Sequence, residues 1–123
     1  MISVSKSWQF QAAHSNPYHP AECKNLHGHT YTVRVWARGN RKPDGIEKGM
    51  VIDLRRMSDT WKRIYAELDH SNLNESTPCD PTTIENLAAY ILDYFRDDLN
   101  DSYTEIFKVR VYEGATAYAE ASL

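Results

Sequence analysis

The sequence has few cysteines and no long apolar run, and both absences narrow the class of protein. Its 123 residues include only two cysteines, Cys23 and Cys79, too few for a disulfide framework. No stretch approaches the roughly 18 apolar residues that a transmembrane helix needs. The first residues, MISVSKSWQFQAAH, lack the apolar core of a signal peptide. We therefore expect a cytoplasmic protein with reduced thiols and no membrane partner.

A strong excess of charge of one sign is also absent. The formal net charge of −3 supplies no basic footprint for nucleic acid or for acidic membranes. No repeat, low-complexity tract or flexible linker divides the chain. Because compact domains peak at roughly 100–150 residues, we expect residues 1–123 to form a single domain. We expect no nucleic-acid partner.

Hydrophobic residues alternate with polar residues along four segments, which is the period of half-buried strands. The four segments are residues 2–14, 26–39, 103–113 and 115–121. In the third segment, Phe107, Val109 and Val111 share the side that we expect to face the core. Four strands cannot close a barrel alone, and they leave two exposed edges. We therefore expect oligomerisation through these edges.

Two segments with helical periodicity separate the second strand from the third. Asp53 is the expected N-cap of the first, where apolar residues from Leu54 to Leu68 recur at steps of three and four. The second opens at PTTIE, where Thr82 and Glu85 stand at capping-box spacing. The order ββααββ predicts an α+β fold, a four-stranded antiparallel sheet with two helices on one face.

Three of the five histidines fall on the expected inner side of the strands. His14 ends the first strand, and His27 and His29 begin the second, so antiparallel pairing would bring all three to one rim of the sheet. Hydrogen-bonded core histidines are one interpretation. Three buried imidazoles are harder to satisfy without an ion, however. Three neutral nitrogen donors suit Zn²⁺ and leave a fourth position open, as in catalytic sites.

A thiol lies close to these histidines in the sequence CKNLHGH. Cys23 could be a fourth ligand, which would close the metal site and make it structural. Alternatively it is a free thiol whose pKa a nearby cation lowers, so that it serves as a base or a nucleophile. The spacing does not decide between these roles.

Two further polar positions are candidates for a site. LDH places Asp69 and His70 in a loop after the first helix, and catalytic residues concentrate in loops. Taken alone, a capping Asp beside a helix-terminal His is the simpler explanation. Glu113 continues the inner side of the third strand, where a carboxylate needs a partner. That partner is either a basic side chain or a ligand with paired N–H donors.

The segments FQAAH, CKNLHGH, LDH, PTTIENLA and VYEG, in this order and spacing, resemble the 6-pyruvoyl-tetrahydropterin synthase superfamily. The CxxxHGH spacing resembles its bacterial 6-carboxy-5,6,7,8-tetrahydropterin synthase branch, which serves queuosine biosynthesis. The resemblance implies the T-fold, in which three subunits close a barrel and two trimers stack into a homohexamer. Gly114 departs from the family pattern, where Thr commonly follows the Glu.

The resemblance also implies a role for each candidate residue. The implied Zn²⁺ ligands are His14, His27 and His29. The implied general base and its proton relay are Cys23, Asp69 and His70, with the last two contributed by a neighbouring subunit. The implied contacts to the pterin ring are Glu113 and, more weakly, Thr83.

The implied reaction converts 7,8-dihydroneopterin triphosphate to 6-carboxy-5,6,7,8-tetrahydropterin, with release of acetaldehyde and triphosphate. Two alternatives stay open. One is a 6-pyruvoyl-tetrahydropterin synthase, which eliminates triphosphate without cleaving the side chain. The other is a T-fold protein that binds zinc or a pterin without catalysis.

Overall fold

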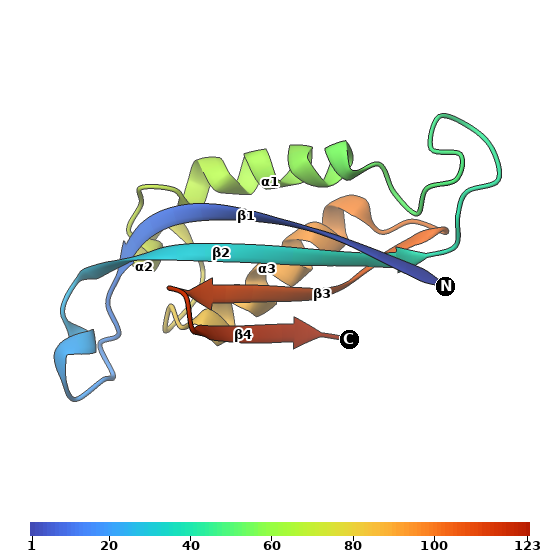
Figure 1. The fold of residues 1–123 in the computed structure, drawn as a ribbon. Coiled ribbons are helices and arrows are strands. Elements are labelled where there is room, and N and C mark those ends of the chain that lie inside the picture. Colours follow the sequence, from blue (N-terminus) through green and yellow to red (C-terminus); the bar gives the residue numbers. More distant parts are fainter.

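Four antiparallel strands form one sheet with the order β1-β2-β3-β4 (Figure 1). The computed structural model describes all 123 residues. The strands are β1 (Ile2–His14), β2 (His27–Gly39), β3 (Thr104–Glu113) and β4 (Ala117–Ser122). Each strand is adjacent to the next one in the chain, although both long helices lie between β2 and β3 in sequence. The predicted sheet is confirmed.

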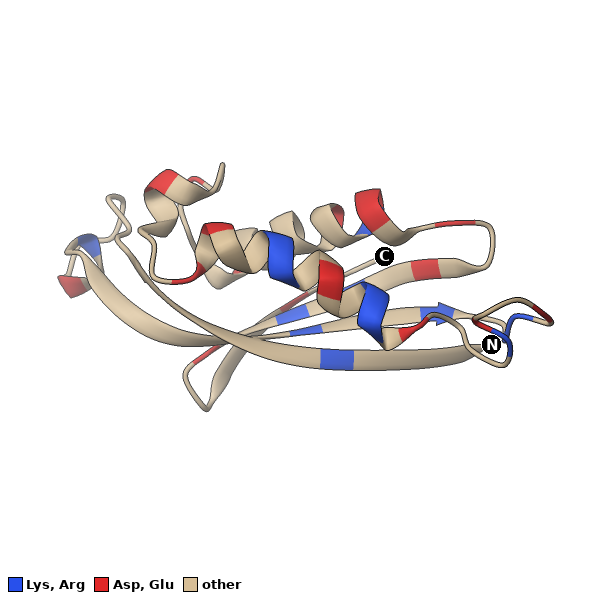
Figure 2. Ribbon diagram, turned by 90° about the horizontal axis from the view of Figure 1, so that it is seen from above, with Lys and Arg blue, Asp and Glu red and all other residues tan.

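Two long helices cover one face of this sheet (Figure 1). They are α1 (Leu54–Leu68), which lies against β1, and α3 (Ile84–Leu99), which lies against β3 and β4. Two shorter elements were not predicted, the 3₁₀ turn η1 (Glu22–Lys24) and the single-turn helix α2 (Leu73–Ser76). No helix is both long enough and apolar enough to cross a bilayer. Figure 2 shows basic and acidic residues interspersed along α1, as expected for a solvated helix face.

One helix start was predicted correctly and the other was wrong by one residue. The Asp53 carboxylate accepts a hydrogen bond from the Arg55 backbone N–H at 2.9 Å and caps α1. In α3 the cap is Thr83, whose hydroxyl accepts from the Asn86 N–H at 3.2 Å. The predicted cap, Thr82, is instead buried. Its hydroxyl is used for contacts with the end of β1, so the helix begins one residue later.

The core lies between the sheet and the two long helices and contains 22 buried hydrophobic residues. The predicted inner side of β2 is fully buried, at Tyr31, Val33, Val35 and Ala37. The two inner positions nearest the start of β2 are His27 and His29. Their imidazoles therefore lie where the hydrophobic core ends.

Phe107 was expected to face the core, and that expectation was wrong. The register between β2 and β3 shifts between Trp36 and Ala37, and Phe107 has no opposite partner. A bulge adds one residue to a strand and reverses the alternation beyond it. Ile106 therefore fills the core position, while the Phe107 ring lies 4.6 Å from the Arg38 guanidinium.

Part of the free edge of β1 is covered by the segment that follows α1. The His70 N–H donates to the Gln11 carbonyl at 2.6 Å, and the Ala13 N–H donates to the Ser71 carbonyl at 2.9 Å. A single bridge joins Ala13 to Asn72 in parallel orientation. These bonds fix the LDH segment beside the end of β1, next to the strands that carry the three histidines.

Candidate functional site

Three imidazole rings meet where β1 ends and β2 begins. His14 pairs directly with His27 across the two strands, and His29 lies one inner position further along β2. The ring centroids are 4.6, 5.2 and 4.8 Å apart, for His14–His27, His14–His29 and His27–His29 respectively. One nitrogen from each ring lies within 4.8 Å of the others. The structure thus assembles the predicted histidine cluster (His14, His27 and His29).

Two members of this cluster are held in one tautomer by backbone carbonyls. His14 Nδ1–H donates to the Thr82 carbonyl at 2.9 Å, and His27 Nδ1–H donates to the Asn25 carbonyl at 2.7 Å. A carbonyl can only accept, so Nδ1 carries the proton and Nε2 keeps its lone pair, as in metal-bound histidines. Burial lowers the pKa of His14, and the nearby His27 and His29 lower it further. Both effects favour the neutral, ligating form.

The histidine cluster has the features that a metal ion would satisfy. The Nε2 atoms of His14 and His29 are buried and make no hydrogen bond. Each buried polar atom left unpaired costs about 1–3 kcal/mol. Three neutral nitrogens are a donor set that suits Zn²⁺ and leaves its fourth position open. The three histidines can therefore form a metal site.

Cys23 is not a member of the group of ligand atoms formed by the three histidines. It lies in η1, on the loop that joins the end of β1 to the start of β2, and its thiol is free and half-buried. The Asn16 N–H donates to the Cys23 carbonyl at 2.8 Å and ties the two halves of this loop together. The loop thus starts and ends next to members of the histidine cluster, His14 and His27.

Asp69 is the C-cap of α1, as the simpler explanation of the sequence held, and it also forms a hydrogen-bonded pair with His70. His70 Nδ1–H donates to Asp69 Oδ2 at 2.6 Å, and Asp69 Oδ1 accepts from the Gln11 N–H at 2.9 Å. The Gln11 N–H, and after it His70, hold the pKa of Asp69 below its usual range. His70 has φ of 55°, an uncommon conformation for a residue other than glycine, and its side chain is 79% exposed. The pair presents an oriented imidazole to the solvent.

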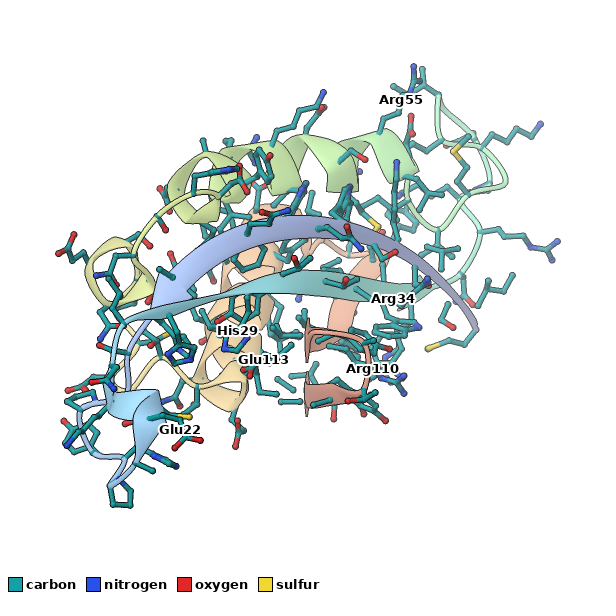
Figure 3. The ribbon with its side chains drawn as sticks, turned by 60° about the vertical axis from the view of Figure 1, so that its left-hand side comes forward. Glu22, His29, Arg34, Arg55, Arg110 and Glu113 are labelled. Atoms are coloured by element: carbon teal, nitrogen blue, oxygen red, sulfur yellow. The ribbon has the colours of Figure 1, made fainter.

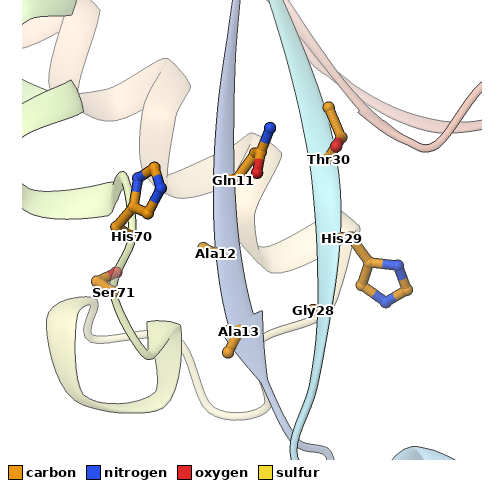
Figure 4. A pocket seen from close by; sticks show the side chains of 8 residues that line it. All are labelled: Gln11, Ala12, Ala13, Gly28, His29, Thr30, His70 and Ser71. Atoms are coloured by element: carbon orange, nitrogen blue, oxygen red, sulfur yellow. The ribbon is translucent and has the colours of Figure 1, made fainter.

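This pair and the histidine cluster are separated by the sheet. Figure 4 shows His70 beside β1 and His29 beyond β2, with both strands between them. A depression of about 500 Å³ lies over these strands, and both His70 and His29 line it, together with Gln11, Ala13, Gly28 and Thr30. The β1–β2 pair nevertheless stands between the two imidazoles, so that within one chain His70 does not face His29.

Glu113 lies at the end of β3, opposite Tyr31 of β2. Its Oε1 atom is 3.3 Å from His29 Nε2, and no Arg or Lys pairs with it (Figure 3). The alternative of a structural salt bridge to Arg or Lys is therefore not what the structure contains. Gly114 follows with φ of 67°, and its N–H donates to the Thr30 carbonyl at 3.0 Å. A glycine suits this left-handed turn, which a β-branched Thr would strain.

The two threonines before α3 differ in their surroundings. Thr83, the weaker predicted contact, caps the helix through Asn86. Thr82 is 1% exposed, and both its carbonyl and its hydroxyl lie within hydrogen-bond distance of His14 Nδ1. Sequence reasoning missed this contact, because Thr82 and His14 are 68 residues apart and share no periodic pattern.

Tyr31 is a second residue whose polar group sequence reasoning missed. It is fully buried, its ring centroid lies 5.7 Å from that of His29, and its hydroxyl has no hydrogen-bond partner. Burial raises the pKa of Tyr31, and the charge of Glu113 raises it further, so the hydroxyl keeps its proton. The only sequence clue was a tyrosine between His29 and the aliphatic inner positions that begin at Val33.

Comparison with protein families gives a direct match. The family model described as 6-pyruvoyl tetrahydropterin synthase matches residues 3–122. The chain belongs to this family. The 6-carboxy-5,6,7,8-tetrahydropterin synthase of Haemophilus influenzae is 29% identical and covers 98% of both chains. The enzyme of the same name from Synechocystis sp. is 37% identical over 74% of this chain and 72% of its own.

Solved structures agree with the family assignment. The 6-pyruvoyl tetrahydropterin synthase of Caenorhabditis elegans matches with a TM-score of 0.83, covering 99% of this chain and 95% of its own at 24% identity. The predicted T-fold of the family is thus confirmed for the single chain. The named relatives are pterin synthases, and membership of the family supports a pterin-synthase function and an enzymatic role here.

Proposed function

We propose that this protein is a Zn²⁺-dependent 6-carboxy-5,6,7,8-tetrahydropterin synthase acting early in queuosine biosynthesis. It would convert 7,8-dihydroneopterin triphosphate and one water to 6-carboxy-5,6,7,8-tetrahydropterin, acetaldehyde and triphosphate. The observation that carries the proposal is the histidine cluster, with unpaired Nε2 atoms next to the Glu113 carboxylate. The CxxxHGH spacing and the names of the two bacterial relatives support this branch over the pyruvoyl branch.

His14, His27 and His29 would hold the Zn²⁺ ion through their Nε2 atoms. When bound, the ion supplies Lewis acidity that makes the side-chain hydroxyls of the substrate more acidic. The carbonyls of Thr82 and Asn25 would keep two of the rings in the ligating tautomer. The chain itself therefore contributes a set of ligands that needs little reorganisation.

Proton transfer is assigned to the thiol and to the Asp69–His70 pair. Cys23 would remove the proton from the side-chain carbon of the substrate as general base. Asp69 accepts a hydrogen bond from His70 Nδ1–H. The other ring nitrogen of His70, Nε2, would therefore exchange protons with the substrate. Groups of this kind typically contribute about 10²–10⁴-fold each.

The pterin ring would be anchored by Glu113. A carboxylate can accept two parallel N–H donors, and because no Arg or Lys pairs with Glu113, it would be able to bind such a ligand. Thr83 would be a secondary contact through its hydroxyl proton, because its oxygen already accepts from Asn86. A pterin ring bound to Glu113 would lie next to His29, and the side chain of the substrate would then extend toward the histidine cluster.

A complete site would need more than one chain. Since His70 and the histidine cluster lie on opposite sides of the β1–β2 pair, the relay that reaches a given cluster would come from a neighbouring subunit (Figure 4). Both β1 and β4 have a free edge, and antiparallel pairing of β4 with β1 of the next chain would close a ring. We infer a trimeric barrel, two of which stack into a homohexamer, in the cytoplasm.

A single product assay combined with metal analysis tests this proposal. The purified protein is incubated with 7,8-dihydroneopterin triphosphate, and acetaldehyde, the pterin product and bound zinc are quantified. We expect acetaldehyde, 6-carboxy-5,6,7,8-tetrahydropterin and close to one zinc per chain. A 6-pyruvoyl product without acetaldehyde would assign the pyruvoyl reaction instead. Bound zinc without any turnover would indicate a non-catalytic binding protein.

A further inference from the structure

A hydrogen-bond network extends from the Nδ1 side of His14 to the surface of α2. The Thr82 hydroxyl lies 3.1 Å from His14 Nδ1 and donates to Asn74 Oδ1 at 3.0 Å. His14 is 7% exposed and Thr82 is 1% exposed, so water does not compete strongly for the contact between them, whereas Asn74 is exposed at the outer end of the network. The network therefore links a member of the histidine cluster to α2.

Asn74 is the residue at which this network branches. Its Oδ1 accepts from the Thr82 hydroxyl and from the Ser15 N–H at 3.1 Å. Its Nδ2 donates to the Ser15 carbonyl at 2.9 Å and lies 3.2 Å from the Ser15 hydroxyl. One amide thus joins the residue that follows His14 to the residue that contacts its ring.

Helix α2 holds this amide in place. The Asn72 side chain caps α2 by accepting from the Asn74 N–H at 3.0 Å, and the bridge from Asn72 to Ala13 attaches the same turn to β1. The two ends of the link, Ser15 and Thr82, lie in loops next to β1 and α3. The link therefore adds a restraint that keeps Thr82 against the His14 ring.

We propose that Asn74, acting through Thr82, is a positioning residue for the metal site. It would hold the Thr82 carbonyl and hydroxyl against His14 Nδ1, and thereby orient His14 Nε2 toward the other two ligands. The inference rests on the proposed metal site and does not depend on which pterin product is formed. Loss of an outer partner of a metal-bound histidine typically weakens metal affinity by about 10–100-fold.

The test measures Zn²⁺ affinity of the full-length protein by competition with a chromophoric chelator. Thr82→Val removes the hydroxyl but keeps the carbonyl, and Asn74→Ala removes the branch point. We expect about 10-fold weaker Zn²⁺ binding in each, in line with such outer partners. Thr82→Ser restores the hydroxyl and should return the affinity to that of the wild type.

Thr77→Val is the matched control. Thr77 is also buried, and its hydroxyl donates to the Leu73 carbonyl at 2.8 Å in the same helix, without contact to a histidine. We expect this variant to lose thermal stability while keeping wild-type Zn²⁺ affinity. The absorption spectrum of bound Co²⁺ should change in Thr82→Val and stay unchanged in Thr77→Val, because only the first alters the ligand geometry.

The possible failures are distinguishable. Wild-type Zn²⁺ affinity in folded Thr82→Val and Asn74→Ala would overturn the positioning role while leaving the proposed function intact. Equal weakening in Thr77→Val would assign the effect to general stability and would also overturn it. A wild-type protein that binds no Zn²⁺ would remove the proposed function together with this inference.

Discussion

His29 Nε2 and Glu113 Oε1 lie 3.3 Å apart and join the start of β2 to the end of β3. One residue belongs to the histidine cluster, and the other is a partly exposed carboxylate that pairs with no Arg or Lys. The proposed metal site and the proposed site for paired N–H donors are therefore adjacent, so that one small ligand would reach both.

His27→Ala should abolish both stoichiometric zinc and turnover, because two imidazoles bind the ion much more weakly than three. Metal analysis of the purified variant is the measurement. His19→Ala is the matched control, since His19 lies in the loop outside the histidine cluster and accepts only the Ala21 N–H. One zinc per chain in His27→Ala would contradict the assigned ligands.

Cys23→Ala should retain zinc and lose about 10²–10⁴-fold in kcat, the usual contribution of a general base. Zinc content and turnover are measured on the same preparation. Cys79→Ala serves as the control, because burial raises the pKa of the Cys79 thiol and makes it a poor base. Loss of the metal in Cys23→Ala would show that the sulfur is a ligand.

Glu113→Gln should weaken pterin binding about 10–100-fold, since charge-assisted hydrogen bonds contribute about 1.5–3 kcal/mol. Pterin fluorescence titration of the zinc-loaded protein gives the Kd. Glu105→Gln removes a carboxylate that pairs with Arg38 far from the histidine cluster, and it should leave the Kd unchanged. Unaltered affinity in Glu113→Gln would remove its role as the anchor.

Mixed oligomers test whether His70 acts on a neighbouring chain. Cys23→Ala and His70→Ala should each be inactive alone. After they are unfolded and refolded together at equal amounts, about one quarter of the sites should combine an intact Cys23 with an intact His70 from another chain. Activity near that fraction of wild type is the expected result. If the mixture stays inactive, the relay operates within one chain.

Tyr31→Phe should not destabilise the metal-free protein and should raise its free energy of unfolding, by up to about 1–3 kcal/mol. The reason is that the deleted hydroxyl is buried without a partner, and an unsatisfied polar group carries a desolvation cost of that order. Denaturant unfolding of both proteins measures the change. A clear loss of stability would mean that the hydroxyl has a partner within the free chain.

The alternation of polar and apolar residues predicted most of the fold and the histidine cluster. The prediction of the cluster succeeded because every second residue of a strand lies on the same face, which puts His14, His27 and His29 on the inner face of the sheet. Antiparallel pairing of β1 and β2 then brings them to one end of the sheet. The orientation of Phe107 was not predicted, because a bulge depends on how two strands pair and cannot be recognised in the sequence of one strand. The N-cap of α3 was misplaced by one residue, because Thr82 and Thr83 have the same local propensity.

The parts of the site that the sequence could not reveal depend on contacts between distant segments. The Asp69–His70 pair is adjacent in sequence, but its position across the sheet from His29 follows from bonds between residues 69–71 and β1. The contact of Thr82 with His14 and the unpaired Tyr31 hydroxyl likewise arise only when the helices pack on the sheet.

Docking of residues 69–71 on β1 also sets a limit on how far a neighbouring strand can extend. On an antiparallel edge strand, every second residue directs its N–H and C=O outward. In β1 the outward groups of Gln11 and the N–H of Ala13 are already occupied by this segment. Only the stretch from residue 2 to residue 9 remains available, a length that the six residues of β4 can fill. In the proposed trimer, residues 69–71 would therefore limit the registers in which β4 of one chain can pair with β1 of the next.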